Sequence, residues 1–381
     1  LKNNANYKKC TPYKLLNVVF GGGLLFSEGE LHRKQRRLMQ PSFQPRYFEQ
    51  FNEGVRGIIS STLDDWHRRP DGQKVDIEEE MSELSRRING FTLFGNDAPP
   101  EINKILNSRV GKLGLLLGTL PLSPQTLYFR HVIRKLDKAI YAAIEKRRNA
   151  PPDAPADMVT TLMNTKYKDS DECMSDRQLR DEIVTLLVSG FDTTARTLTW
   201  AFHVMNEHPE IEQKFRAELD EVLGGRMPSF DDLPKLVYTT KMIQETMRMF
   251  PPNPTIGRVA VEDDEIDGHH IPAGSVMTLS PYLAHRNARH WPNPEVFDPE
   301  RFAPENMEGR HRFAYCPFGG GARQCIGKGI ALMTIPLSIA SIAQHYSVRA
   351  LPNAREMEYD IKVTFRSRRR MFMTHHQLQT H

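Results

Sequence analysis

Apolar residues recur at every third or fourth position along most of the chain, which is the spacing of an amphipathic helix. The segments with this spacing are Phe48–Trp66, Val75–Leu93, Leu127–Arg148, Asp176–His208 and Glu210–Leu223. Strand-like pieces are short and are separated by turn signals; they are Gly257–Val261, Ser275–Leu279 and Ile361–Phe365. We therefore expect a mainly α fold with a small β subdomain.

The bulk composition narrows the class of protein. The chain has 381 residues, enough for one large domain, and its 39% hydrophobic content is ordinary for a globular protein. Its net charge is +4, but the 51 basic residues are interspersed with 47 acidic ones, so nucleic-acid binding is not expected. The longest apolar runs are far shorter than the roughly 20 residues that a membrane span needs.

The spacing of the cysteines indicates the redox state of the compartment in which the protein works. Cys10, Cys173, Cys316 and Cys325 lie far apart without paired spacing, so they suggest neither a disulfide framework nor a zinc ribbon. A reducing compartment, and hence a cytoplasmic location, is expected. Because the chain starts at Leu1 rather than at a methionine, the sequence leaves open whether a signal or an anchor precedes it.

The most informative segment is a glycine-rich loop that ends at a cysteine. It runs from Phe318 through three glycines to Cys325 and Gly327, and an apolar helix is expected to follow. Near a helix N-terminus, backbone N–H groups and the helix dipole stabilise a thiolate, which is the form that ligates iron. A phosphate loop or a buried structural cysteine is the alternative. The loop lacks the lysine and the serine or threonine of a phosphate cradle.

This loop resembles the heme-binding loop of the cytochrome P450 family, which is matched at Phe318, Gly321, Arg323, Cys325 and Gly327. The resemblance implies a heme b cofactor whose iron takes Cys325 as its axial ligand. It further implies that Arg323 bonds a heme propionate and that Phe318 shields the thiolate.

A second segment, Ser189–Ala195, lies in the middle of the long helix expected over Asp176–His208. Glycine and β-branched threonines are poor helix formers, and such a defect can open a helix. The segment resembles the oxygen-activation segment of the family, with Asp192 as the acid and Thr193 as the hydroxyl that relay protons. Taken alone, the segment would indicate a glycine–threonine kink in a core helix rather than a catalytic site.

A third motif carries a glutamate and an arginine three positions apart on one helix, Glu245 and Arg248. In isolation such a spacing indicates a surface ion pair. Together with Arg301, in the proline-rich segment Trp291–Phe302, it resembles the family's glutamate–arginine–arginine set. Its implied role is structural, in folding the loop beneath the heme.

Early in the chain, His32 and Arg36 stand four residues apart on one expected helix face, so that two donors could reach one carboxylate. A solvated basic helix is the plain alternative. By the resemblance both side chains bond a heme propionate, and Arg258 matches a third propionate-contacting position.

The motifs keep the family's order over nearly the whole chain. The resemblance implies the cytochrome P450 fold in a single domain over residues 1–381, without the helix and strands that normally precede residues 3–25. It also implies a monooxygenase that activates dioxygen and hydroxylates or epoxidises an apolar lipid, steroid or terpenoid-like substrate. A peroxide-using heme-thiolate enzyme and a non-enzymatic heme sensor or carrier remain the alternatives.

No flavin or nicotinamide domain follows Cys325, so electrons are expected from a separate ferredoxin or flavodoxin with its reductase, and NAD(P)H takes part only indirectly. Candidates for a basic docking face, with scattered surface charge as the alternative, are Arg33, Lys34, Arg37, Arg310, Arg312 and Lys328. By family position, the substrate pocket would be lined by Gly21–Leu25, Leu113–Pro121, Val184–Thr193, Asn253–Gly257 and Ser367–Arg370. An inward Arg369 or Arg370 would instead favour a carboxylate-bearing substrate.

Overall fold

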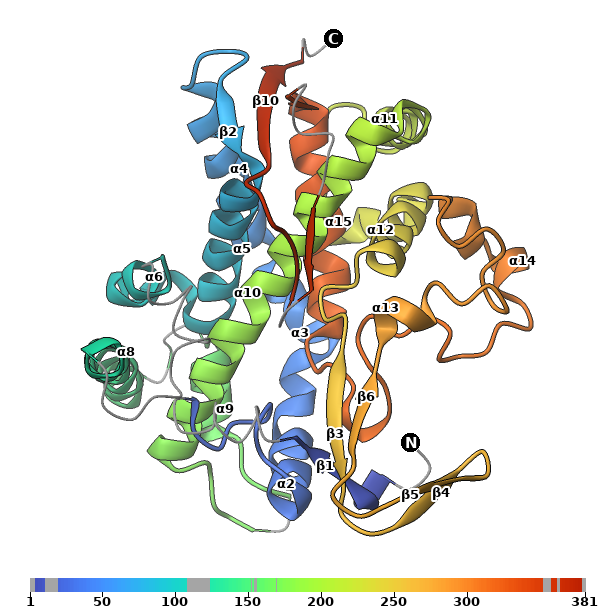
Figure 1. Cartoon of the computed structure of the whole chain (residues 1–381). Helices are drawn as coiled ribbons and strands as arrows, with labels where there is room; N and C mark the ends of the chain where they lie inside the picture. Colours follow the sequence, from blue (N-terminus) through green and yellow to red (C-terminus); the bar gives the residue numbers. More distant parts are fainter. Residues whose placement is uncertain are drawn as a thin grey trace. The chain divides into compact units, whose positions relative to one another are not determined.

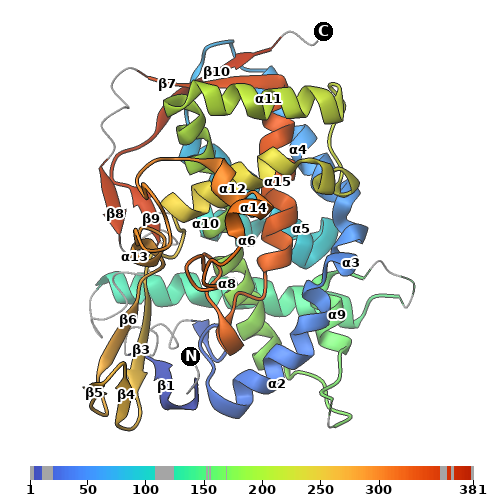
Figure 2. The ribbon, with the colours of Figure 1, turned by 90° about the vertical axis from the view of Figure 1, so that its right-hand side faces the viewer.

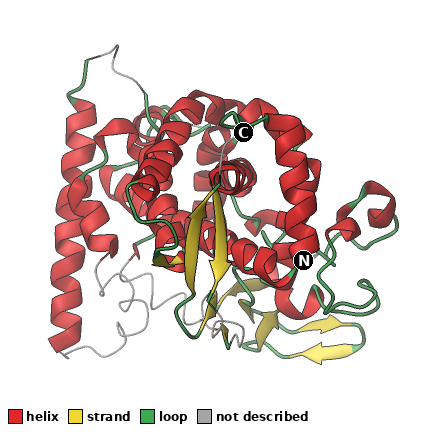
Figure 3. Ribbon diagram, turned by 90° about the horizontal axis from the view of Figure 1, so that it is seen from above, coloured by secondary structure: helices red, strands yellow, loops and turns green. Residues whose placement is uncertain are grey.

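Helices dominate the computed structural model, and the strands gather in small sheets (Figure 3). The structure describes residues 4–10, 20–107, 124–151, 153, 156–168, 170–351, 358–361 and 364–378. The helices are α2 (Gly29–Met39), α3 (Pro45–Phe48), α4 (Asn52–His67), α5 (Ile77–Phe94), α6 (Pro100–Asn107), α8 (Pro124–Arg148), α9 (Met158–Asn164), α10 (Asp176–Glu207), α11 (Pro209–Leu223), α12 (Val237–Met249), α13 (Pro281–Ala284), α14 (Pro304–Met307) and α15 (Lys328–His345).

The helices predicted from periodicity are all present, with ends that differ by a few residues. The mainly α fold is therefore confirmed. The largest difference at a helix start is at α4, which begins at Asn52 rather than at Phe48, since Pro45–Phe48 and Glu49–Phe51 form separate short helical turns ahead of it.

The strands pair in four small sheets among the described residues. β1 (Tyr7–Lys9), β3 (Ile256–Ala260) and β6 (Val276–Leu279) make one sheet in the order β1-β3-β6, seen side by side in Figure 2. The other strands are β2 with β10 (Phe372–Gln377) and β7 (Tyr346–Ala350), β4 (Asp264–Ile266) with β5 (His269–Ile271), and β8 (Tyr359–Ile361) with β9 (Phe365–Ser367).

One strand prediction is wrong. Ile361–Phe365 was expected to be a continuous strand, but Ile361 ends β8 and Phe365 begins β9, and the two residues pair with each other. The apolar alternation of the sequence continues from β8 into β9, so the pattern did not reveal that the two ends pair antiparallel.

The chain forms two compact units. The first comprises residues 1–44, 88–189 and 257–277, and the second comprises residues 45–87, 190–256 and 278–381. In the second unit α15 is buried along residues 334–343, as expected of a helix that is apolar on every face. A stack of Trp200 on Phe250, with ring centroids 4.4 Å apart, anchors the aromatic part of this core.

Helix α10 passes through the oxygen-activation-like segment without a break (Figure 1). The expected opening of the helix is therefore not seen. The Ser189 hydroxyl donates to Thr185 O (2.7 Å), and the Thr194 hydroxyl donates to Gly190 O (3.2 Å). Both hydroxyls thus bond carbonyls one turn earlier on the same helix, and the helix continues through Gly190.

Candidate functional site

The cysteine loop forms a tight turn just ahead of α15, which begins at Lys328. The Cys325 N–H donates to Phe318 O (2.9 Å), which closes the loop on itself. Gly319 and Gly321 both have φ of 66°, a conformation that other residues adopt only with strain. Cys325 is exposed, so its sulfur is accessible beside a helix N-terminus, where a thiolate is stabilised.

The surroundings of this sulfur fit a thiolate-ligated macrocycle. A Cβ on Gly327 would lie 3.9 Å from Cys325 Sγ, an ordinary van der Waals contact, so Gly327 packs beside the sulfur. Arg323 ends the short 3₁₀ turn Gly321–Arg323 and is partly exposed, within the same loop as the cysteine. Chemically, the loop offers one soft anionic ligand and one guanidinium for an acidic group.

Glu245 and Arg248 form an ion pair in the interior of the second unit, and both side chains are 0% exposed. Two bonds of 2.6 and 2.8 Å join them in a bidentate arrangement. Glu245 also accepts the Asp298 N–H (2.8 Å) and lies 3.4 Å from Arg301 Nε. One carboxylate therefore ties α12 to the proline-rich segment at two points.

His285 links this ion pair to the residues ahead of the cysteine loop. Its Nε2 accepts the Cys316 N–H (2.9 Å), and its Nδ1 faces Arg248 O at 3.2 Å. Since Nε2 accepts, the proton of the neutral ring belongs on Nδ1, from which it can donate to that carbonyl. Burial lowers the pKa of His285 to about 3, which keeps the ring neutral.

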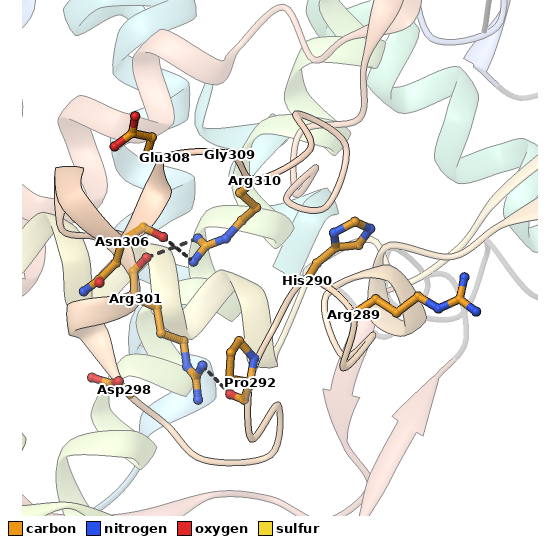
Figure 4. A pocket seen from close by; sticks show the side chains of 9 residues that line it. All are labelled: Arg289, His290, Pro292, Asp298, Arg301, Asn306, Glu308, Gly309 and Arg310. Atoms are coloured by element: carbon orange, nitrogen blue, oxygen red, sulfur yellow. Dashed lines mark hydrogen bonds between the residues drawn. The ribbon is translucent and has the colours of Figure 1, made fainter.

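Figure 4 shows a cavity of about 430 Å³ on the proline-rich segment. Arg310 donates to Arg301 O (3.1 Å) and Asn306 O (2.9 Å), and its guanidinium lies 4.1 Å from the Trp291 ring. The lining residues are Arg289, His290, Pro292, Asp298, Arg301, Asn306, Glu308, Gly309 and Arg310. This polar lining does not suit an apolar substrate, and it shares no residue with the segments predicted to line the substrate pocket.

Asp192 lies within a network of charges in the second unit. Its carboxylate contacts Arg196 one turn further along α10 (2.9 Å) and Arg366 of β9 (3.0 and 3.1 Å). Arg196 in turn pairs with Glu78 at the start of α5. Burial raises the pKa of Asp192, but the two guanidiniums outweigh it, so the pKa lies below the ordinary carboxyl value. Asp192 is therefore ionised at neutral pH.

The predicted propionate donors His32, Arg36 and Arg258 belong to the first unit. His32 is buried and Arg36 partly exposed one turn apart on α2, and Arg36 donates to Gln40 Oε1 (2.8 Å). Arg258 lies on β3 opposite Lys9 of β1 and donates to Gly257 O (2.8 Å).

The remaining predicted residues share the second unit. They are Asp192, Thr193, Glu245, Arg248, Arg301, Phe318, Arg323, Cys325 and Gly327. Of the predicted pocket walls, Leu113–Pro121 lies outside the described residues.

Sequence reasoning missed several residues that surround the predicted ones. Arg196 could have been found, because it stands four positions after Asp192 on the same helix. Arg366 and Glu78 come from distant segments, and His285 sits in a short turn after α13, so no local pattern marks them.

Comparisons with known proteins identify the family. The family model described as Cytochrome P450 matches residues 2–373. Cyclooctat-9-en-7-ol 5-monooxygenase of Streptomyces melanosporofaciens is 33% identical over 363 residues, which are 92% of this chain and 78% of that protein. Pentalenene oxygenase of Streptomyces avermitilis is 30% identical over 94% of this chain and 80% of that protein.

A solved structure agrees on the fold. The heme domain of cytochrome P450DA superposes with a TM-score of 0.91 at 22% identity, covering all of this chain and 85% of that one. The chain belongs to the cytochrome P450 family and is a heme-dependent monooxygenase. Of the helices described, none combines the length and the apolar composition needed to cross a membrane.

Proposed function

We propose that this cytochrome P450 hydroxylates or epoxidises an apolar, terpenoid-like substrate, using dioxygen and electrons from a separate redox partner. The names of two relatives, a cyclooctat-9-en-7-ol monooxygenase and a pentalenene oxygenase, support the substrate class. The observation that carries the proposal is the exposed Cys325 in a glycine turn ahead of α15.

Cys325 would bind the iron of heme b through its thiolate. Arg323, His32, Arg36 and Arg258 would donate to the heme propionates, because guanidinium and imidazole N–H groups are suited to carboxylates. Phe318 and Gly327 would shield the sulfur on its loop side. When bound, heme supplies the activation of dioxygen and the transfer of one oxygen atom.

Asp192 and Thr193 would move the protons that this chemistry consumes. Asp192 is held as a carboxylate by Arg196 and Arg366, so it must take up a proton at Oδ1 or Oδ2 before it can pass one on. Arg366 is 42% exposed and Arg196 is 5% exposed. We therefore propose that the contact between Arg366 and Asp192 is the one that opens. Protons would then reach Asp192 from solvent on the Arg366 side. A peroxide-using enzyme would not need this acid.

The basic turn after β9 offers no support for a carboxylate-bearing substrate. The side chain of Arg369 is 66% exposed and pairs with Glu358, and that of Arg370 is 76% exposed near Asp76. Both cations therefore have acidic neighbours at the surface, and an apolar substrate remains the better choice.

Electrons would come from a ferredoxin or flavodoxin with its own reductase, which draws on NAD(P)H. The predicted docking residues are exposed or partly exposed cations, as an acidic donor protein requires. The lack of paired spacing among the four cysteines in the sequence supports a reducing, cytoplasmic location.

The first test is the absorption spectrum of the heme-loaded protein, reduced and exposed to carbon monoxide. A strongly red-shifted Soret band is expected, and Cys325→Ala should abolish it. Cys316→Ala is the matched control, because Cys316 lies nearby in sequence but is partly buried and burial raises the pKa of its thiol. The ligand assignment would be refuted if only the control variant lost the band, or if both variants kept it.

A second test addresses the substrate. A polycyclic terpene hydrocarbon, a terpene alcohol and a long-chain fatty acid can be titrated against the heme-loaded protein, with the spectral shift as the binding signal. The terpenes should bind more tightly, and oxygenated product should form only with redox partners and NADPH. Equal or tighter binding of the fatty acid would overturn the substrate class.

A further inference from the structure

The loop Gly21–Leu25, here called the glycine loop, packs its backbone directly on the first half of α10. The Gly22 N–H donates to Asp181 Oδ2 (2.8 Å), and the Leu24 N–H donates to Glu182 Oε2 (2.8 Å). A Cβ on Gly23 would lie 2.2 Å from Thr185 Oγ1 and 2.6 Å from Asp181 O. Only glycine permits this approach, so two adjacent carboxylates hold the loop by its main chain.

The ends of the glycine loop are held independently of α10. The rings of Phe20 and Phe26 stack with centroids 5.4 Å apart, and both side chains are buried. Gln35 of α2 adds a bond from its amide to Gly22 O (2.8 Å). Neither of these two contacts involves α10, so neither has to break for the loop to separate from that helix.

Asp181 and Glu182 differ in whether a neighbouring cation offsets their negative charge. Asp181 pairs with Arg180 (2.8 Å). Glu182 is 0% exposed and accepts the Gln178 amide (2.8 Å) and the Leu24 N–H, but it forms no ion pair within the described part of the chain. Burial raises the pKa of Glu182 to about 7, and the negative charge of Asp181 adds to this effect, while the two hydrogen bonds lower it.

Other charged or titratable groups that face this pair are few. Tyr167, whose pKa is raised mainly by its burial, lies within electrostatic range of Glu182. Arg180 also bonds Asp137 of α8 (2.7 Å), so its charge is shared between two carboxylates. None of these contacts offers Glu182 a cation of its own.

We propose that the glycine loop is a proton-coupled latch, which closes on α10 when Glu182 is protonated and opens as Glu182 ionises. In the open loop Glu182 gains water and can carry its charge at little cost. In the closed loop an ionised Glu182 would be buried beside Asp181 without a cation. Closure therefore takes up a proton. The family resemblance implies that Gly21–Leu25 lines the substrate pocket, so, resting on the proposed function, the latch also makes substrate access depend on pH.

The size of the effect follows from linkage. The pKa of Glu182 is about 7 with the loop closed and is expected near the ordinary value of 4.5 with it open. Because the pKa is higher in the closed state, closure is favoured at low pH, and opening increases as the pH rises. The ratio of open to closed loop therefore rises by up to about 300-fold over the whole pH range. Between pH 5.5 and pH 8 it rises by about 25-fold.

The test follows hydrogen exchange of the Gly22 and Leu24 amides in the full-length, heme-loaded protein between pH 5.5 and pH 8. After correction for the intrinsic chemical rate, the opening of the loop should increase about 25-fold. Glu182→Gln keeps an acceptor oxygen but cannot ionise, so it should make the opening independent of pH. Glu28→Gln is the matched control, because Glu28 also accepts a backbone N–H, that of Lys9 (3.0 Å), and is only partly buried.

Equal pH dependence in the wild type and Glu182→Gln would overturn the latch, and so would opening that does not change with pH in the wild type. Should Glu182→Gln fail to fold, Asp181→Asn provides a second variant. Removing the neighbouring negative charge should move the midpoint of opening to lower pH, and an unchanged midpoint would refute the proposal. These measurements follow amides rather than product, so they stand or fall separately from the terpenoid assignment.

Discussion

Replacing Glu245 by glutamine would remove a negative charge that three contacts share. Glu245 pairs with Arg248, contacts Arg301 and accepts the Asp298 N–H. Glutamine has almost the same shape, so little space is created. The variant instead leaves the Arg248 guanidinium, which is 0% exposed, without a counter-charge.

The magnitude follows from burial. Breaking a fully buried ion pair by neutralising one partner costs about 3–5 kcal/mol of unfolding free energy, because the remaining charge cannot be solvated. Arg248 keeps its bonds to His285 O (2.8 Å) and Val296 O (3.2 Å), which lessen the loss but do not supply charge. We therefore expect Glu245→Gln to destabilise the protein by about 3 kcal/mol. The heme-loaded protein should also release heme more readily.

The chain offers a matched control on its surface. Glu30 and Arg33 have the same residue types, the same spacing and a contact of 2.8 Å, but their side chains are 57% and 64% exposed. Glu30→Gln should change the unfolding free energy by less than about 1 kcal/mol. Urea denaturation of both variants, followed by tryptophan fluorescence, makes the comparison. Equal effects of the two substitutions would refute the argument that burial sets the strength of the buried pair.

Three other substitutions each remove one titratable group. Asp192→Asn should destabilise the protein near neutral pH, and the difference should shrink as the pH falls through the lowered pKa of Asp192; a difference that does not shrink at all on acidification would contradict this. Burial lowers the pKa of His375, so the wild type should lose stability as the pH falls below about 6.5, and His375→Phe should lose less. The measurement is the melting temperature as a function of pH, and the same slope in both proteins would contradict the reasoning. His285→Ala should cost about 1–3 kcal/mol in urea denaturation, because the Cys316 N–H loses its acceptor, and a negligible loss would speak against this link.

Helix periodicity was a reliable guide to this fold, and strand alternation was a poorer one. Long helices such as α8 and α10 repeat their apolar spacing over many turns, so the signal accumulates. Ile361–Phe365 spans five residues, too few to distinguish a strand from two strand ends that face each other. The pairing of β10 with β2 joins segments about 300 residues apart, for which no local pattern exists.

The candidate site shows the same division between local and distant contacts. The cysteine loop could be predicted because its glycines and Cys325 lie within ten consecutive residues. The charge balance around Asp192 could not, since Arg366 and Glu78 reach it from separate elements. The ionised state of Asp192 therefore emerged only from the structure.

The position of β10 also has a consequence for biosynthesis. β10 is the central strand of its sheet, between β2 and β7, although it is the last described strand of the chain. On the ribosome, β2 is made early and must wait for residues 372–377 before the strand exists that it pairs with in the described part of the chain. We expect the second unit to remain open to chaperones and proteases until residues 372–377 have been made.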